Sequence, residues 1–339
     1  MKNVFFPLAI VGLLVIGCSK DDEQMIPIFP SVINESKLVT TSNTSGKISY
    51  TNLLASNPET KNLTITSTDA DGAYYDSSKD EFILASRTNN RLELYKGVSS
   101  SVKNNTDNVS LQFSSTASEF NNPREIFVVK DKVVVTQDQN AANGNTNKFL
   151  VYQKTTSSFT LLNSYTLNFK VWGIHIDGTT LYAIADLTGD VVVFNDFFSN
   201  ADGAITPTKR VTIEGLIRTH GITFSKTDNR MILTDVGSAA SDVDGGLIVI
   251  NNFSNVIANT SNGGTVALAD QIRIYGPNSK LGNPVDVAYD NVTNKIYVAE
   301  RLNAGGQVLT FALPTSTADA TPEKSVLEPG VSSVYLIRK

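Results

Sequence analysis

Short apolar segments recur along the chain, each bounded by glycine, asparagine, aspartate or serine. The clearest is a polar residue followed by an apolar run that ends in a small or acidic residue. It occurs six times, and successive copies begin 44 to 65 residues apart. Their β-branched and aromatic residues predict β-strands. The six copies are residues 37–42, 81–86, 132–137, 180–185, 230–235 and 295–300.

Further short segments surround each copy. A polar turn and a second apolar segment follow, and a shorter segment such as 173–176 or 286–289 precedes. A fourth segment comes later, as at 62–66. No window of about 12 residues or more shows a helical period with caps. Four short strands in each of six repeats predict an all-β fold, a six-bladed β-propeller with four-stranded blades.

The two ends of the repeat array predict how the ring closes. The first repeat begins at its second strand, and the last segment, 329–337, aligns with 283–289 but has no blade after it. We therefore predict that residues 331–337 supply the inner strand of blade one and hide an otherwise open sheet edge. Residues 31–33 are the alternative for that strand, and both alternatives give six blades.

The N-terminal residues predict export. Lys2 precedes an apolar run at 4–16, which is shorter than the about 20 residues of a transmembrane helix and is typical of a signal peptide. The only cysteine of the chain, Cys18, follows Gly17. Residues 14–18 resemble the bacterial lipoprotein box, in which that cysteine is acylated. The alternative is a chance cysteine after a signal peptide that is cut elsewhere.

The segment after Cys18 refines this prediction. Residues 19–23, Ser-Lys-Asp-Asp-Glu, resemble the surface-export signal of Bacteroidota lipoproteins, with a solvated linker as the alternative. The predicted organisation is a signal peptide at 1–17, a lipidated cysteine with an acidic tether at 18–30, and a propeller at 31–339. The resemblance implies palmitate or similar acyl chains at Cys18, attachment to the outer membrane, and exposure at the cell surface.

Two pairs of segments resemble a known repeat. Residues 284–289 with 295–300, and 220–224 with 231–235, are similar to the NHL-type and YVTN-type repeats of six-bladed propellers. The resemblance covers essentially residues 30–339. It implies the fold and leaves the function open, because hydrolases, lyases, lectins and interaction scaffolds share this architecture.

Composition narrows the function. The chain has 28 Lys and Arg against 33 Asp and Glu, so there is no support for nucleic-acid binding, which needs a basic surface. One cysteine and two histidines exclude a disulfide framework and leave little for a histidine or cysteine metal site. No phosphate loop, dinucleotide motif or serine-hydrolase elbow occurs. The sequence therefore assigns no catalytic residue.

Candidate ligand-binding residues follow from the repeat alignment. In propellers, the loops that enter the inner strands and leave the second strands gather around the axis on one face. A tryptophan or arginine there suits sugar rings, whereas core packing or mutual pairing is the alternative. The candidates are Asp71, Arg87, Arg124, Glu125, Trp172, His220, Asp286 and Arg301.

Carboxylates are the candidates for a metal site, because Ca²⁺ prefers oxygen ligands. Asp235 and Glu300 end second strands near the predicted axis, with bracing of the next loop as the alternative for Asp235. Asp242 and Asp244 form an Asp-x-Asp-Gly segment that is typical of a calcium turn but lacks the other acids of an EF-hand. A plain acidic hairpin is the alternative.

The sequence leaves two main functions open, besides a weaker third, an assembly scaffold that would use its outer blade edges. The first is a surface or outer-membrane lipoprotein whose propeller binds a glycan, a peptide or an envelope protein at its central face without catalysis. The second is a metal-assisted hydrolase or lactonase, or a lyase, that acts at the propeller axis with Ca²⁺ or another divalent metal.

Overall fold

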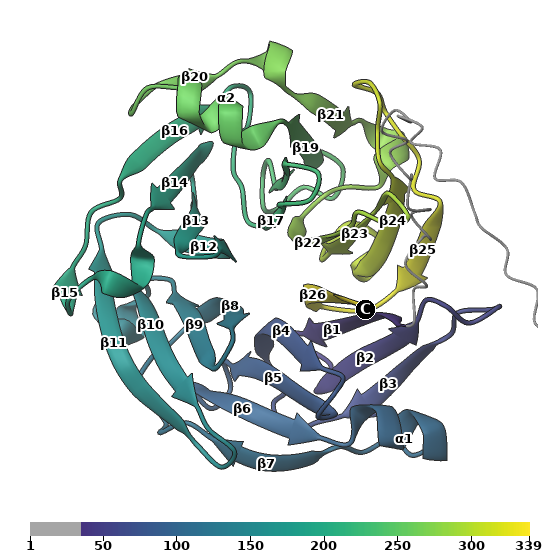
Figure 1. Ribbon diagram of the computed structural model, residues 1–339. Helices are drawn as coiled ribbons and strands as arrows, with labels where there is room; N and C mark the ends of the chain where they lie inside the picture. The colour runs from purple at the N-terminus through teal and green to yellow at the C-terminus, as the bar shows by residue number, and fades with distance from the viewer. Residues whose placement is uncertain (1–34) are drawn as a thin grey trace, which may run out of the picture. The chain divides into compact units, whose positions relative to one another are not determined.

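Six β-sheets surround a central channel in the computed structural model, which describes residues 35–339 (Figure 1). The predicted signal peptide, Cys18 and the tether lie outside the described residues, as does the alternative strand at 31–33. Each sheet is one blade, with its first strand nearest the channel and its last strand at the rim. The predicted six-bladed β-propeller is confirmed.

Blades 1 to 3 contain the following strands, from the channel outward. Blade 1 consists of β26 (Val331–Arg338), β1 (Ser36–Ser42), β2 (Lys47–Asn52) and β3 (Thr60–Thr64). Blade 2 consists of β4 (Ala70–Asp76), β5 (Glu81–Ser86), β6 (Arg91–Lys96) and β7 (Ser110–Ser114). Blade 3 consists of β8 (Pro123–Val129), β9 (Lys132–Gln137), β10 (Asn147–Lys154) and β11 (Phe159–Leu167).

Blades 4 to 6 follow the same order. Blade 4 consists of β12 (Val171–Asp177), β13 (Thr180–Ala185), β14 (Asp190–Phe194) and β16 (Lys209–Ile213). Blade 5 consists of β17 (Ile222–Ser225), β18 (Arg230–Asp235), β19 (Gly246–Asn251) and β21 (Ile272–Tyr275). Blade 6 consists of β22 (Pro284–Asp290), β23 (Lys295–Glu300), β24 (Gln307–Ala312) and β25 (Lys324–Leu327).

The C-terminal strand closes the ring, as the sequence predicts. Strand β26 pairs with β1 in antiparallel register, with Leu38 opposite Leu336. At the ends of these strands, Glu35 and Lys339 exchange two backbone hydrogen bonds of 2.9 and 3.0 Å. Blade 1 is therefore built from both ends of the described chain.

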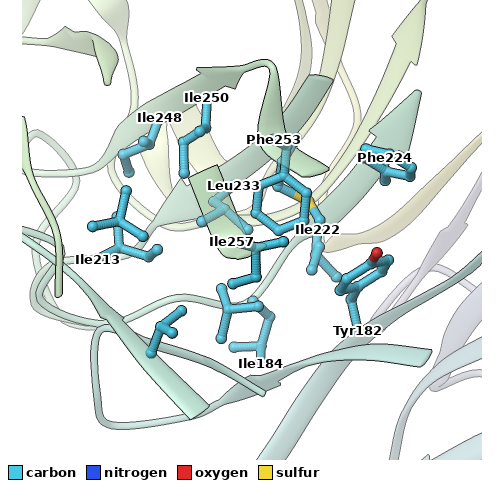
Figure 2. Close-up of a cluster of buried hydrophobic side chains, with 14 of the residues drawn as sticks. Tyr182, Ile184, Ile213, Ile222, Phe224, Leu233, Ile248, Ile250, Phe253 and Ile257 are labelled. Atoms are coloured by element: carbon cyan, nitrogen blue, oxygen red, sulfur yellow. The ribbon is translucent and has the colours of Figure 1, made fainter. Parts of the chain in front are cut away.

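A hydrophobic cluster fills each of the six junctions between neighbouring blades. The cluster between blades 4 and 5 also takes in the short helix α2 (Phe253–Asn259), whose Phe253 and Ile257 pack among Ile184, Ile213 and Leu233 (Figure 2). Burying one such side chain stabilises the fold by about 1.5–3 kcal/mol. The junctions between blades, and not the single sheets, therefore hold most of the core.

A second set of contacts links neighbouring blades at the rim. Strand β15 (Gly203–Ala204) of the blade 4 connection pairs in parallel with β11 of blade 3, and β20 (Thr265–Val266) of the blade 5 connection pairs with β16 of blade 4. Single parallel bridges join Thr64 to Asn108 and Ile274 to Ala318 in the same sense. Four of the six junctions are thus tied at the rim as well as packed.

Helices are short in the described part of the chain. Helices α1 (Val98–Asn104) and α2 have seven residues each. Neither they nor the 3₁₀ turns are long and apolar enough to cross a membrane. The 3₁₀ turns are at Ala141–Asn143, Phe197–Ser199, Leu268–Asp270, Pro277–Ser279 and Asn303–Gly305.

Candidate functional site

Three glycines bring neighbouring inner strands into close contact at one level of the channel. A Cβ atom at Gly173 would lie 2.2 Å from the backbone oxygen of His220, and one at Gly221 would lie 2.8 Å from the Cα of Asp286. Gly72 has a φ of +69°, and a Cβ there would lie 2.7 Å from the backbone nitrogen of Ile126. No larger residue fits these positions, so the glycines set how tightly the inner strands approach one another.

Most of the predicted ligand-binding residues meet on the loop face, the face where second strands end and inner strands begin. Arg87 binds Asp71 at 3.1 Å, and Asp71 is 4.0 Å from Arg124, which itself binds Asp138 at 3.2 Å. Lys170 then lies 3.5 Å from Asp138. The chain of ion pairs runs from blade 2 to blade 4 around the axis.

The same chain of ion pairs continues to blade 5. Lys170 is 3.7 Å from Asp186, and Arg218 binds Asp186 through two nitrogens at 2.7 and 3.2 Å. Four carboxylates and four cations compensate one another in this group, which we call the polar network. Its members are Asp69, Asp71, Asp138, Asp186, Arg87, Arg124, Lys170 and Arg218.

Three flat side chains are stacked beside the polar network. The guanidinium carbon of Arg124 lies 4.0 Å from the centre of the Trp172 ring, and the His220 ring lies 3.5 Å from Trp172 on an interplanar angle of 6°. Trp172 is 7% exposed and His220 2%. The stack therefore joins blades 3, 4 and 5 as a packed core, and it offers little surface to a ligand.

The protonation states of the stack follow from burial and from Asp186. Burial lowers the pKa of His220 to about 4, although the hydrogen bond with Asp186 opposes this. Burial alone would raise the pKa of Asp186, but hydrogen bonds from His220 and Arg218 hold it well below its usual range. At neutral pH the imidazole is neutral and the carboxylate is charged, so His220 positions Asp186 and carries no charge to a ligand.

Arg301, Asp235 and Glu300 form no ion pair with the polar network, although the charge of Arg301 opposes the rise that burial causes in the pKa of Asp71. Arg301 is half-buried, and its backbone nitrogen donates to Asn283 at 3.0 Å. Asp235 accepts hydrogen bonds from the backbone nitrogens of Ile217, Arg218 and Gly237 and from the Tyr275 hydroxyl. Glu300 accepts four backbone hydrogen bonds of 2.9 Å. Each carboxylate thus holds two loops by hydrogen bonds, the loop that follows its own strand and the loop that enters the inner strand of the same blade.

The predicted metal ligands do not come together. Asp242 and Asp244 lie exposed in the β18–β19 loop, where Asp244 accepts a hydrogen bond from the Ser238 backbone nitrogen at 3.1 Å. Within residues 35–339, no group of three or more His, Cys, Asp or Glu is arranged to hold a metal ion.

A cavity of about 310 Å³ occupies the channel beyond the polar network. Its walls come from all six inner strands, and we call it the channel cavity. Glu125, Asp286 and Ser333 line it, and Arg124, Trp172 and His220 do not. A pocket of about 260 Å³, which shares Tyr74, Tyr289 and Tyr335 with it, continues to the C-terminal residues. The wall includes Tyr74, Phe127, His175, Thr223, Phe224, Ala288, Tyr289 and Tyr335.

Glu125 and Asp286 come from blades 3 and 6, which lie opposite each other in the ring. Glu125 is 8% exposed and Asp286 is 6% exposed. Burial raises the pKa of Glu125 well above its ordinary value, and the charge of Asp286 raises it further. Burial also raises the pKa of Asp286 to about 6, against hydrogen bonds from Val334 and Ser333. Both groups therefore keep their protons to a higher pH than an exposed carboxyl group does.

Aromatic rings form much of the cavity wall. Tyr74 and Tyr335 are 5.1 Å apart, Phe127 and His175 are 4.9 Å apart, and His175 lies 6.1 Å from Phe224, all between ring centres. Neither the Tyr74 nor the Tyr335 hydroxyl has a hydrogen-bond partner within residues 35–339. Burial lowers the pKa of His175 to about 4, and its Nδ1 accepts from the Phe224 backbone nitrogen at 3.3 Å. The wall is therefore apolar with a few neutral polar groups.

Sequence analysis missed these wall residues. The repeat alignment predicts the candidate site at the start of the inner strands, and of its residues the structure places Glu125 and Asp286 in the lining of the channel cavity. Tyr74, Phe127 and Tyr335 occupy the aligned position two residues further along. The same alignment, extended by two residues, contains the signal for them.

Comparisons with known proteins agree with the fold. No model of a protein family and no curated protein matches the chain. Among solved structures, a chain of a nidogen/laminin complex aligns with a TM-score of 0.59 at 12% identity, over 89% of this chain and 98% of that one.

Two aligned structures come from Bacteroides. A protein of unknown function from Bacteroides caccae has a TM-score of 0.58 at 10% identity, over 90% of this chain and 100% of its own. A putative 6-phosphogluconolactonase from Bacteroides fragilis has a TM-score of 0.59 at 11% identity, over 91% and 100%. At these identities the likeness concerns architecture only, and the chain is similar to propellers from Bacteroides without sharing a demonstrated activity.

Proposed function

We propose that this propeller is a ligand-binding protein without catalytic activity, and that the channel cavity is where the ligand binds. The observation that carries the proposal is the cavity itself, about 310 Å³ of space lined by rings from successive blades. Small-molecule sites are concave, mostly apolar and furnished with a few polar groups. The size favours a small molecule, or one sugar unit or side chain of a larger glycan, peptide or envelope protein.

Filling the cavity tests this function. Thr223 lines the cavity, whereas Thr160 is exposed on β11. A library of sugars, amino acids, amines and short peptides is screened by thermal unfolding, since a ligand at about 100 times its Kd adds about 2.7 kcal/mol of stability. We expect hits that Thr223→Phe abolishes and Thr160→Phe retains. Hits that survive Thr223→Phe would place binding elsewhere.

We also propose that the protein acts at the cell surface as an outer-membrane lipoprotein. The support is the sequence around Cys18, with its preceding apolar run and following acidic tether. Growth with an alkyne-labelled palmitate should label the wild type and not Cys18→Ser. Protease added to intact cells should then degrade the wild-type propeller. Equal labelling of both forms would remove the lipid anchor from the proposal.

The acid pair supports a second candidate function. A buried carboxyl with a raised pKa is the usual general acid of hydrolases and lyases. Glu125 and Asp286 have this property and line the cavity. An activity screen on oligosaccharides and lactones, with and without Ca²⁺, tests it. Turnover that Glu125→Gln abolishes would replace the binding function by an enzymatic one.

A further inference from the structure

We infer that the ligand of the channel cavity carries a positively charged amino or ammonium group, held between the Glu125 carboxylate and the aromatic wall. This inference rests on the proposed function, because it names the chemical class that the cavity takes. Three features of the cavity lead to it: the sign of its charges, the free oxygen of Glu125, and the rings around it.

The charges in the cavity have one sign. Among the residues that line it, Glu125 and Asp286 are the only ones with an ionisable acid, and no lysine or arginine is present. His175 is the one other residue of the wall whose type usually changes its charge near neutral pH, and its lowered pKa keeps the imidazole neutral there. The cationic members of the polar network, including Arg124, do not line the cavity. When either carboxyl group is ionised, no cation of the wall compensates its charge, so a cationic ligand would be attracted and an anionic ligand would be repelled.

The two carboxyl groups differ in how they are held. Asp286 accepts from the Val287 nitrogen at 2.7 Å, the Ser333 hydroxyl at 2.7 Å and the Val334 nitrogen at 2.8 Å. Glu125 accepts only at Oε1, from the Ile126 nitrogen at 2.8 Å. Its Oε2 has no hydrogen-bond partner within residues 35–339, although the residue is 8% exposed. Because Glu125 lines the cavity and Oε2 accepts no hydrogen bond from the protein, this oxygen is available to accept one from a ligand N–H.

The wall provides the second part of a cation site. Tyr74, Phe127, Phe224 and Tyr335 line the same cavity as the acid pair. The negative face of an aromatic ring attracts an ammonium group, and several rings around one carboxylate form the usual cage for alkylated amines. A neutral sugar would use the rings and hydroxyls, but it would leave the charge of the acid pair uncompensated.

The test compares a cation with its neutral isostere. Choline and 3,3-dimethyl-1-butanol have nearly the same shape, but only choline is charged. Both are titrated calorimetrically into the purified full-length chain, and n-butylamine serves as a second cation. We expect choline or n-butylamine to bind at least about tenfold more tightly than the neutral alcohol. We also expect Glu125→Gln to remove that difference and to leave binding of the alcohol unchanged.

A matched control separates the site from general effects of a buried acid. Glu328 is also a buried glutamate with a raised pKa, but it lies between blades 6 and 1 and accepts from Thr40 and Ser49. Glu328→Gln should leave choline binding unchanged. If Glu125→Gln fails to fold, Asp286→Asn replaces it, with the same expected loss of discrimination.

The outcomes also distinguish this inference from the function on which it rests. If the alcohol binds as tightly as both cations, and Thr223→Phe blocks it, the cavity binds ligands but the inference is wrong. If neither cation binds, the inference is wrong, and the library screen decides separately whether the cavity binds anything. Cation binding that survives Glu125→Gln and Asp286→Asn also overturns it.

Discussion

Glu125 and Asp286 show how a residue's position in the ring decides its chemistry. Other carboxylates near the axis are neutralised by a cation or by backbone N–H groups, as for Asp186 and Glu300. Glu125 and Asp286 face the cavity without a cation. Their raised pKa values follow first from burial and then from nearby negative charge, that of Asp286 on Glu125 and that of Asp71 on Asp286, and groups of this kind occur often where a protein acts on a ligand.

Asp286 should make the stability of the fold depend on pH. Its pKa is about 6 in the folded protein, raised from 3.8, so its contribution is complete below about pH 4 and is lost as the pH rises through 6. The two histidines act in the opposite sense, because their folded pKa values are near 4. The contribution of Asp286 is therefore separated from that of the histidines by comparing the unfolding free energies of the wild type and an Asp286 variant at each pH.

We expect Asp286→Asn to remove this loss of stability. Between pH 4 and 7, the difference in unfolding free energy between wild type and variant should shrink by about 2 kcal/mol as the pH rises. Urea unfolding at several pH values measures it. Asp242→Asn, an exposed change in the β18–β19 loop, is the control and should show a constant difference. A constant difference for Asp286→Asn would mean that Asp286 is charged throughout this range.

At the scale of elements, the inner strands approach one another through glycine. Gly173 donates its backbone N–H to the His220 oxygen at 3.1 Å, directly between β12 and the loop that enters β17. A side chain there would separate the two blades beside the Trp172–His220 stack. The contact between β12 and the loop that enters β17 therefore requires a residue without a Cβ atom at position 173.

Gly173→Ala should therefore destabilise the fold by several kcal/mol, because a Cβ 2.2 Å from a backbone oxygen forces the strands apart. Gly178→Ala is the matched control. It lies in the turn after the same strand, with a φ of +62° and no atom within 4 Å of the added Cβ, so it should cost about 1 kcal/mol through backbone strain alone. Equal losses in chemical denaturation would contradict this account.

The repeat pattern predicts the elements well and the site only in part. The six segments taken as second strands are β1, β5, β9, β13, β18 and β23, within one residue at each end. These strands are buried along almost their whole length, so each one is a short continuous apolar run between polar residues, and such runs are visible in the sequence. Aligned repeats also bring Asp71, Arg124 and Trp172 to one face.

The repeat pattern does not determine at which end side chains fill the channel. Trp172 closes the loop face because Arg124 and His220, from two other blades, stack on either side of it. That arrangement depends on the length and direction of three side chains, which no pattern along one strand contains. The cavity is left at the level of Tyr74 and Tyr335, where the wall is held open by rings.

At the scale of the whole molecule, ring closure connects the site to the fold. Strand β26 completes blade 1, and it also supplies Ser333, which holds Asp286, and Tyr335, which lines the cavity. Its Val331 and Val334 pack between blades 6 and 1, and Ile337 packs between blades 1 and 2. One strand therefore contributes to the sheet, to two cores and to the binding site.

Removing β26 and re-joining it should have opposite effects. A chain of residues 35–330 loses Val331, Val334 and Ile337 from these two cores and leaves the β1 edge open, so it should show no cooperative thermal transition and should aggregate. In a circular permutant, an Asn-Gly turn joins Lys339 to Glu35, which already exchange backbone hydrogen bonds, and makes β26 and β1 a hairpin. New ends fall between the exposed Thr116 and Ala117.

We expect this permutant to melt within a few degrees of the linear chain 35–339, because every strand pair and every junction between blades is kept. The permutant keeps β26 and changes the order of the chain, whereas the truncated chain keeps the order and lacks β26, so calorimetry on both separates the role of the strand from that of chain order. A permutant that unfolds like the truncated chain would show that order of synthesis, and not the β26–β1 pairing, closes the ring. Retained choline binding in the permutant would further show that the channel cavity depends on the closed ring alone.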